Sequence, residues 1–153
     1  MIIADLIDAA FLELGVKELP GLEANEPEIL KYFEEIGKTW IKTDETAWCS
    51  AAHNYIHKIC GYEFTGALNG QSWLEIGIPT NTPYSGCTAV FWYGTEDNGG
   101  GPNGWRGHVG FWLRERKGWT YVLGGNQSNQ YRVSAYLTSR ALGYRIPKKR
   151  NMQ

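Results

Sequence analysis

Residues 43–61, TDETAWCSAAHNYIHKICG, place one cysteine directly after a tryptophan and before a run of small residues. The stretch predicts a helix over residues 48–60, with Asp44 or Thr46 as its N-terminal cap. Cys49 then lies in the first helical turn, where unpaired backbone N–H groups and the helix dipole favour a thiolate. Inert packing is also compatible with this position, so the rest of the chain has to decide whether Cys49 is a nucleophile.

Two further helices are predicted upstream of this cysteine. Apolar residues at helical spacing indicate the first over residues 2–14. Asn25 and Glu28 form a capping-box-like pair that begins the second, and Gly37 closes it. A short helix is expected at GQSWLEIG, residues 70–77.

After Pro83 the sequence changes to short aromatic and β-branched runs that glycines separate, which is typical of strands. Five strands are predicted, near residues 88–93, 108–115, 119–125, 130–136 and 143–147. Helices followed by antiparallel strands predict an α+β fold in which N-terminal helices pack on a C-terminal antiparallel sheet. We see no internal repeat, and we expect a single domain over residues 1–153.

Charge and composition exclude several classes of partner. The 153 residues carry a net charge of −1, so no global field attracts nucleic acid or an anionic membrane. Three cysteines are an odd number, which excludes a complete disulfide framework and fits folding in a reducing cytoplasm. The first 14 residues carry acidic residues and no basic segment, so we expect a helix and no signal peptide. No apolar run approaches the roughly 20 residues that span a bilayer, so membrane insertion is not expected.

A thiol nucleophile needs a base, and the chain offers three histidines. His53 and His57 share a helix with Cys49, whereas a base must approach the nucleophile from across the cleft. His108 begins a predicted strand, and glycines on either side leave room for a helix to approach. We therefore expect His108 to be the base, with Trp112, on the same strand face, as a substrate-contacting candidate. A surface histidine at a strand end is the simpler alternative.

A third polar group is expected to fix the tautomer of the imidazole. LGGNQ, residues 123–127, supplies Asn126 and Gln127 at the end of the next predicted strand. The carbonyl of Asn126 is the preferred acceptor for the ring N–H, and Gln127 is the second candidate. The alternative is that the Gly-Gly-Asn segment is only a turn.

A zinc site is the competing interpretation of the cysteine-containing helix. His53 and His57 at i and i+4 suit one ion, and Cys49 or Cys60 would add a ligand. One straight helix cannot wrap four side chains around a metal, and neither a Cys-x-x-Cys nor an HExxH pattern is present. We therefore expect no metal and no cofactor.

Three motifs occur together in the order WC (48–49), GHVGF (107–111) and LGGNQ (123–127). In this order and spacing the chain resembles phage and bacterial peptidoglycan hydrolases of the CHAP (cysteine/histidine-dependent amidohydrolase/peptidase) and NlpC-type papain-like group. The segments GVKELPG, TGALNGQSWLEIG and ALGYRIP also resemble landmarks of that group.

The resemblance implies a papain-like domain in which Cys49 is the nucleophile, His108 the general base and acid, and Asn126 the orienting residue. It places Asp44, Trp48 and Gln127 in supporting or substrate-binding positions. The chain departs from the group at Cys87, where an aspartate is common, and at His53, where an aromatic residue is usual.

The implied activity is cleavage of an amide bond in bacterial peptidoglycan. A monomeric phage or prophage endolysin is the expected setting, made in the cytoplasm without a signal peptide and delivered to the wall through a holin. The alternatives are an antibacterial effector with the same chemistry that a secretion system exports, and a wall-binding module without turnover. A cytoplasmic peptidase or amide-transfer enzyme is a further possibility.

Overall fold

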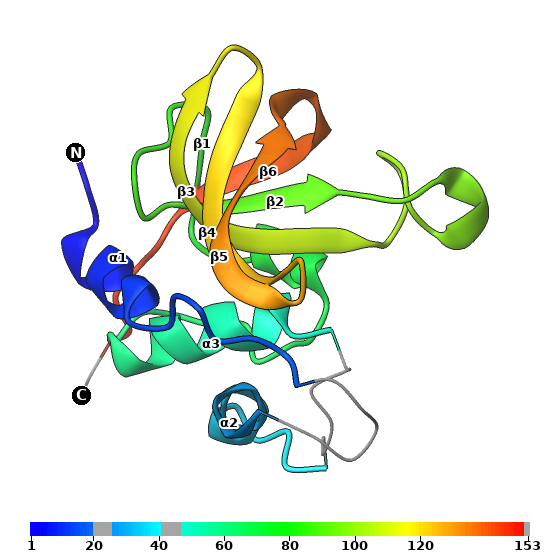
Figure 1. Cartoon of the computed structure of the whole chain (residues 1–153). Coiled ribbons are helices and arrows are strands. Elements are labelled where there is room, and N and C mark those ends of the chain that lie inside the picture. The colour runs from blue at the N-terminus through cyan, green and yellow to red at the C-terminus, as the bar shows by residue number, and fades with distance from the viewer. Residues whose placement is uncertain (20–25, 41–46, 152–153) are drawn as a thin grey trace.

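Helices form the first part of the chain and strands the second (Figure 1). The computed structural model describes residues 1–19, 26–40 and 47–151. Its helices are α1 (Ala4–Phe11), α2 (Pro27–Glu35) and α3 (Cys49–Ile59), with short 3-10 helices η1 (Gly70–Leu74), η2 (Glu96–Asn98) and η3 (Thr138–Arg140). Its strands are β1 (Ile78–Thr80), β2 (Thr88–Trp92), β3 (Gly107–Arg116), β4 (Trp119–Gln127), β5 (Gln130–Leu137) and β6 (Ala141–Ile146).

The strands form one antiparallel sheet in the order β1-β6-β2-β3-β4-β5. The sheet curls strongly, since the ring of Tyr136 on β5 stacks on Phe91 of β2, three strands away in the sheet order, with 5.2 Å between centroids. The predicted α+β fold, with N-terminal helices on a C-terminal antiparallel sheet, is confirmed.

Helix α3 lies between the sheet and α2, and Figure 1 shows α2 on the side of α3 away from the strands. Helix α1 contacts both α3 and β4. The main core fills the space between these helices and the sheet with apolar and aromatic side chains, among them Leu6, Ile29, Tyr32, Phe33, Trp48, Ile56, Phe111, Leu123 and Tyr131. This burial holds the N-terminus of α3 against β3 and β4.

The helix starts differ from the sequence prediction. Helix α2 begins at Pro27, and its N-terminal cap is Glu26, whose side chain accepts a hydrogen bond from the N–H of Glu28 at 3.3 Å. The predicted cap Asn25 lies outside the described residues and is not the N-cap. Proline suits the first helical position because its missing N–H would have no intrahelical partner there.

Helix α3 begins at Cys49, and the residue in its cap position is Trp48, which makes no side-chain cap bond. Asp44 and Thr46 are therefore not its N-cap, and both lie outside the described residues. The predicted helix end is confirmed, because Gly61 directly follows the cap residue with φ of +81°, a conformation that glycine adopts at little cost.

The five predicted strands are present as β2 to β6, and β1 is a short edge strand that the sequence did not indicate. The short helix expected at residues 70–77 is the 3-10 helix η1. It packs tightly on the beginning of β3, because a Cβ on Gly70 would lie 2.3 Å from the carbonyl oxygen of Gly107. Glycine at position 70 is thus required for η1 to border the site described next.

Candidate active site

Cys49 is the first residue of α3 and is only 7% exposed. The N-terminus of α3 approaches β4 closely at Gly125, where an added Cβ would lie 2.6 Å from the Trp48 ring and 3.0 Å from the Cβ of Ala52. The small residues in both elements thus allow the helix start to pack against the sheet. Because the first N–H groups of a helix have no intrahelical acceptor, the Cys49 sulfur lies near an unsatisfied, positively polarised end.

His108 supplies the imidazole beside this sulfur. It lies on β3 opposite Phe91 of β2, and it is buried. Burial by itself would raise the pKa of the Cys49 thiol, but hydrogen-bonding and coulombic interactions with His108, together with backbone N–H groups of Val109 and Ser50, lower it below its ordinary value. The first-turn N–H of Ser50 is the helix-start effect that the sequence predicted.

The pKa of His108 shifts in the opposite direction. Burial would lower the pKa of the imidazole, but its interactions with Cys49 and a hydrogen bond with Gln127 raise it above the ordinary value. A thiol with a lowered pKa next to an imidazole with a raised pKa favours the thiolate–imidazolium pair. The structure therefore brings Cys49 and His108 together in the arrangement that an activated thiol requires.

Gln127 holds the other side of the His108 ring. Its Oε1 lies 2.8 Å from His108 Nε2, and its Nε2 donates to the carbonyl oxygens of Val122 at 3.1 Å and Arg132 at 2.6 Å. Since both amide hydrogens have carbonyl acceptors, the amide oxygen faces the ring and His108 Nε2 carries the proton. The Nδ1 atom is then the nitrogen available to the thiol.

The expected partner, Asn126, is not the residue against the ring. Between Gly124 and Gln127, β4 advances three residues while β5 advances two, from Arg132 to Gln130, so β4 contains a bulge. Asn126 adopts φ of +55° there. In a regular strand without the extra residue, Asn126 would lie opposite Gln130, on the face that carries His108. Because of the bulge, Gln127 occupies this position opposite Gln130. Asn126 instead lines the cavity beside the site.

Tyr136 on β5 completes the surroundings of the imidazole, and no motif in the sequence indicated it. Its ring stacks on His108 with centroids 5.0 Å apart and an interplanar angle of 22°. Its hydroxyl donates to Gln127 Oε1 at 3.1 Å. Burial raises the pKa of the Tyr136 hydroxyl, so it stays protonated as a donor. The residue reaches the site only because the sheet curls, which no local pattern reveals.

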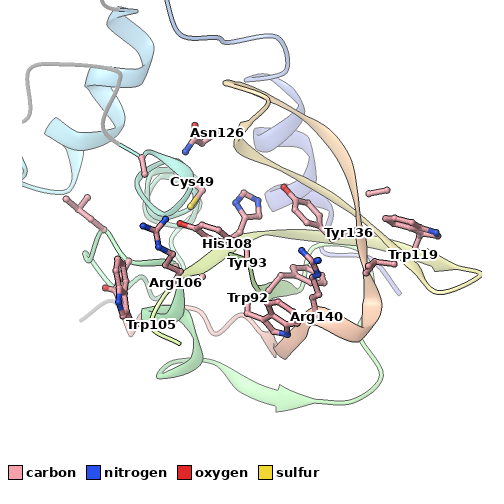
Figure 2. Close-up of a pocket in the computed structure, with 18 residues that line it drawn as sticks. Cys49, Trp92, Tyr93, Trp105, Arg106, His108, Trp119, Asn126, Tyr136 and Arg140 are labelled. Carbon is pink, nitrogen blue, oxygen red and sulfur yellow. The ribbon is translucent and has the colours of Figure 1, made fainter. Parts of the chain in front are cut away.

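Cys49 and His108 open into a cavity of about 630 Å³ (Figure 2). A volume of this size suits a small ligand or a segment of a polymer. Cations and aromatic rings dominate the described part of its lining, which includes no carboxylate. The principal side chains are Trp92, Tyr93, Trp105, Arg106, Trp119, Tyr136 and Arg140. The sequence analysis did not single out these aromatic residues or the arginines.

Two other predicted supporting residues lie away from this cavity. Trp48 is fully buried in the core, and its Nε1 donates to Glu18 Oε1 at 2.9 Å. Trp112 packs partly buried against the cluster of Ala89, Phe91 and Val122 inside the curl of the sheet. Neither is among the lining residues, so both support packing. Asp44 lies outside the described residues.

The other two histidines are buried in the core. His53 Nε2 lies 2.9 Å from Thr88 Oγ1, and His57 Nδ1 lies 2.9 Å from the carbonyl oxygen of His53. Their rings pack against Trp73 and Phe111. Within the described ranges, no group of three histidine, cysteine, aspartate or glutamate side chains is arranged to hold a metal ion.

No protein-family model matches this chain, and no curated protein matches it. None of the helices in the described part of the chain has the length and apolar character needed to cross a membrane.

Proposed function

We propose that this protein is a papain-like cysteine hydrolase that cleaves an amide bond in bacterial peptidoglycan. The observation that carries the proposal is the row of Cys49 at a helix start, His108 beside it, and Gln127 on the far nitrogen of the ring. Nucleophile, base and orienting group in this order are the parts of a thiol-dependent acyl transfer. Gln127 takes the role that the sequence resemblance gave to Asn126.

The reaction proceeds through a thioester. The Cys49 thiolate attacks the amide carbonyl carbon, and backbone N–H groups at the start of α3, including that of Cys49, stabilise the oxyanion. The C–N bond then breaks, and the imidazolium of His108 donates its Nδ1 proton to the leaving amine. Water, deprotonated by His108, attacks the thioester and releases the new carboxylic acid and the Cys49 thiol. Gln127 keeps the ring in one orientation throughout, with its oxygen against His108 Nε2.

Two features support a wall substrate over other amides. The motifs that resemble the CHAP and NlpC-type group include both Cys49 and His108, together with the segment that contains Gln127. The cavity beside them is lined by the exposed aromatic residues Trp105 and Trp119, and such side chains suit sugar rings and peptide backbones. We propose a monomeric phage or prophage endolysin that reaches the wall through a holin, and a secreted antibacterial effector as the second setting for the same chemistry.

Digestion of purified peptidoglycan tests the proposal. Wild-type protein is incubated with sacculi of both single-layered and multilayered types, and released fragments are identified by mass spectrometry. We expect fragments that carry a new amine and a new carboxylic acid, and none with Cys49→Ala. His108→Ala is expected to slow release by about 10²–10⁴-fold. Binding of the wild-type protein to sacculi without any new fragment would indicate a wall-binding module and contradict the proposal.

A further inference from the structure

Arg106 lies in the cavity two residues before His108, and the protein fixes its position. Its N–H donates to the carbonyl oxygen of Gly99 at 3.1 Å, and its own carbonyl oxygen accepts from Gln71 Nε2 at 3.0 Å. The side-chain Nε donates to the carbonyl oxygen of Asn98 at 2.7 Å. The backbone of Arg106 and the Nε atom of its guanidinium are therefore held in place without a ligand.

Two aromatic rings further restrain the guanidinium. Its central carbon lies 5.2 Å from the ring centroid of Trp105 and 5.8 Å from that of Tyr93. Figure 2 shows this guanidinium on the same side of the cavity as Cys49, whereas Arg140, on the ring of Trp92, lies at the far side of the His108 ring. Stacking on rings orients the planar cation and leaves its edge free for hydrogen bonds.

Among the described residues, no carboxylate forms an ion pair with this cation. Within residues 1–19, 26–40 and 47–151, three ion pairs form, and neither Arg106 nor Arg140 takes part in any of them. The acidic residues of the neighbouring loop, Glu96 and Asp97, form no ion pair with Arg106, and Asp97 instead accepts from the Thr95 hydroxyl. A restrained guanidinium in a concave site without an acidic partner is suited to an anionic ligand group.

We propose that Arg106 is a specificity-determining residue that binds a free carboxylate of the substrate beside the amide that Cys49 attacks. This inference rests on the proposed function, and it names the form of wall peptide that the site selects. Stem peptides present carboxyl groups next to their amide bonds, either as free acids or as carboxamides. The N–H groups of the Arg106 guanidinium donate to a free carboxylate in a charge-assisted pair. A carboxamide is neutral and leaves the cation unpaired.

Binding to the inactive Cys49→Ala variant tests this without turnover. The probes are a muramoyl tripeptide with L-alanine, γ-linked D-glutamate and L-lysine, and two analogues. One analogue has the D-glutamate α-carboxyl converted to the carboxamide, and the other has the C-terminal carboxyl converted. Affinities are measured by calorimetry at low and high salt. We expect one of the two carboxyl-to-carboxamide conversions to weaken binding by about 10–100-fold, which is the range of a hydrogen bond to a charged group.

Arg106→Gln in the Cys49→Ala background is expected to remove the preference between the free acid and that carboxamide. The matched control is Arg114→Gln, because Arg114 also stacks on a ring, 4.8 Å from the Tyr121 centroid, but does not line the cavity. The control should keep the full preference. Arg106→Lys retains the charge and loses the planar guanidinium, so it should keep part of the preference. It replaces Arg106→Gln as the test variant if Arg106→Gln melts at a lower temperature than the wild-type protein.

The inference is overturned if neither conversion weakens binding, if no tripeptide binds, or if the full preference survives in Arg106→Gln or, where that variant is destabilised, in Arg106→Lys. Turnover of sacculi by the wild-type protein is a separate readout. An inactive wild-type protein whose Cys49→Ala form still prefers the free acid through Arg106 would contradict the proposed hydrolysis and support carboxylate recognition. An active wild-type protein without that preference would support the proposed hydrolysis and contradict carboxylate recognition by Arg106.

Discussion

The oxygen of the Gln127 side chain lies 2.8 Å from His108 Nε2, while both hydrogens of the same amide are bound to the carbonyl oxygens of Val122 and Arg132. The backbone therefore fixes the amide orientation, and the amide in turn fixes the histidine tautomer. A glutamine held in this way acts as a rigid extension of β4. The sheet thus orients His108 through one side chain.

Replacing Gln127 should damage catalysis more than replacing its neighbour. Gln127→Ala leaves His108 Nε2 without its acceptor, so we expect kcat to fall by about 10²-fold and the apparent pKa of His108 to drop. Asn126→Gly removes the neighbouring side chain and suits the positive φ at that position, so kcat should stay within about threefold. Steady-state rates and pH–rate profiles of both variants on a soluble wall fragment measure the difference. A larger loss in Asn126→Gly would return the orienting role to Asn126.

The hydroxyl of Tyr136 should contribute less than its ring. Tyr136→Phe removes one neutral hydrogen bond to Gln127 Oε1 but keeps the ring that stacks on His108. We expect a loss of about 3–10-fold in kcat, the scale of one such bond. Tyr136→Leu, which also removes the stacking, should lose more. Equal rates for Tyr136→Leu and the wild-type protein would show that the stack has no part in catalysis.

His57 should make the fold sensitive to acid. Burial lowers the pKa of His57 from 6.5 to about 4, so the folded protein binds this proton less readily than the unfolded chain does. Its contribution to stability is therefore complete above pH 6.5 and is lost as the pH falls towards 4. The loss is about 3 kcal/mol, from roughly 1.4 kcal/mol for each pKa unit.

His57→Phe keeps a ring against Phe111 and Trp73 and removes the titrating group. Denaturant unfolding of both proteins at several pH values between 4 and 7 measures the difference in slope. We expect the variant to lose less stability than the wild-type protein over this range. Parallel curves would show that His57 does not titrate on unfolding.

Gly125→Ala should separate the start of α3 from β4. The added methyl would lie 2.6 Å from the Trp48 ring, so we expect a loss of about 1–3 kcal/mol in the free energy of unfolding and a fall in activity. Trp48→Phe replaces the indole with a smaller ring and makes room for the added methyl. The double variant should therefore lose less free energy of unfolding than the sum of the two single losses. Thermal and denaturant unfolding of the single and double variants tests this. Strictly additive losses would contradict the contact.

The sequence supported the position of Cys49 and His108 because local rules apply to both. The segment from Trp48 to Cys60, which Gly61 ends, indicates a helix, and GHVGF indicates a strand that begins with histidine. Local rules could not predict that Gln127, and not Asn126, contacts the His108 ring. This contact depends on a bulge before the tight turn at Ser128 and Asn129, and no motif in the sequence indicates that bulge.

Residues that reach the site through tertiary structure were not found from the sequence. Tyr136 contacts His108 because the sheet curls through several strands, and Arg106 lies at the end of a loop that η1 and the residues around Asn98 hold in place. No periodicity or motif encodes these contacts, since they join segments whose separation only the fold sets. The sequence contains seven tryptophans, and their number alone does not separate Trp105 in the cavity from Trp48 in the core.

The pH dependence of iodoacetamide alkylation tests most directly whether Cys49 is an activated thiolate. Peptide mapping gives the rate for each thiol between pH 4 and 10, in the wild-type protein and in His108→Ala. We expect Cys49 to react fastest at neutral pH, because the pKa of Cys49 is lowered while burial raises the pKa values of Cys60 and Cys87. His108→Ala should raise the apparent pKa of Cys49 and remove its advantage at neutral pH. Alkylation of Cys49 at an ordinary thiol pKa in both proteins, or an inert Cys49 beside a reactive Cys60, would contradict the account.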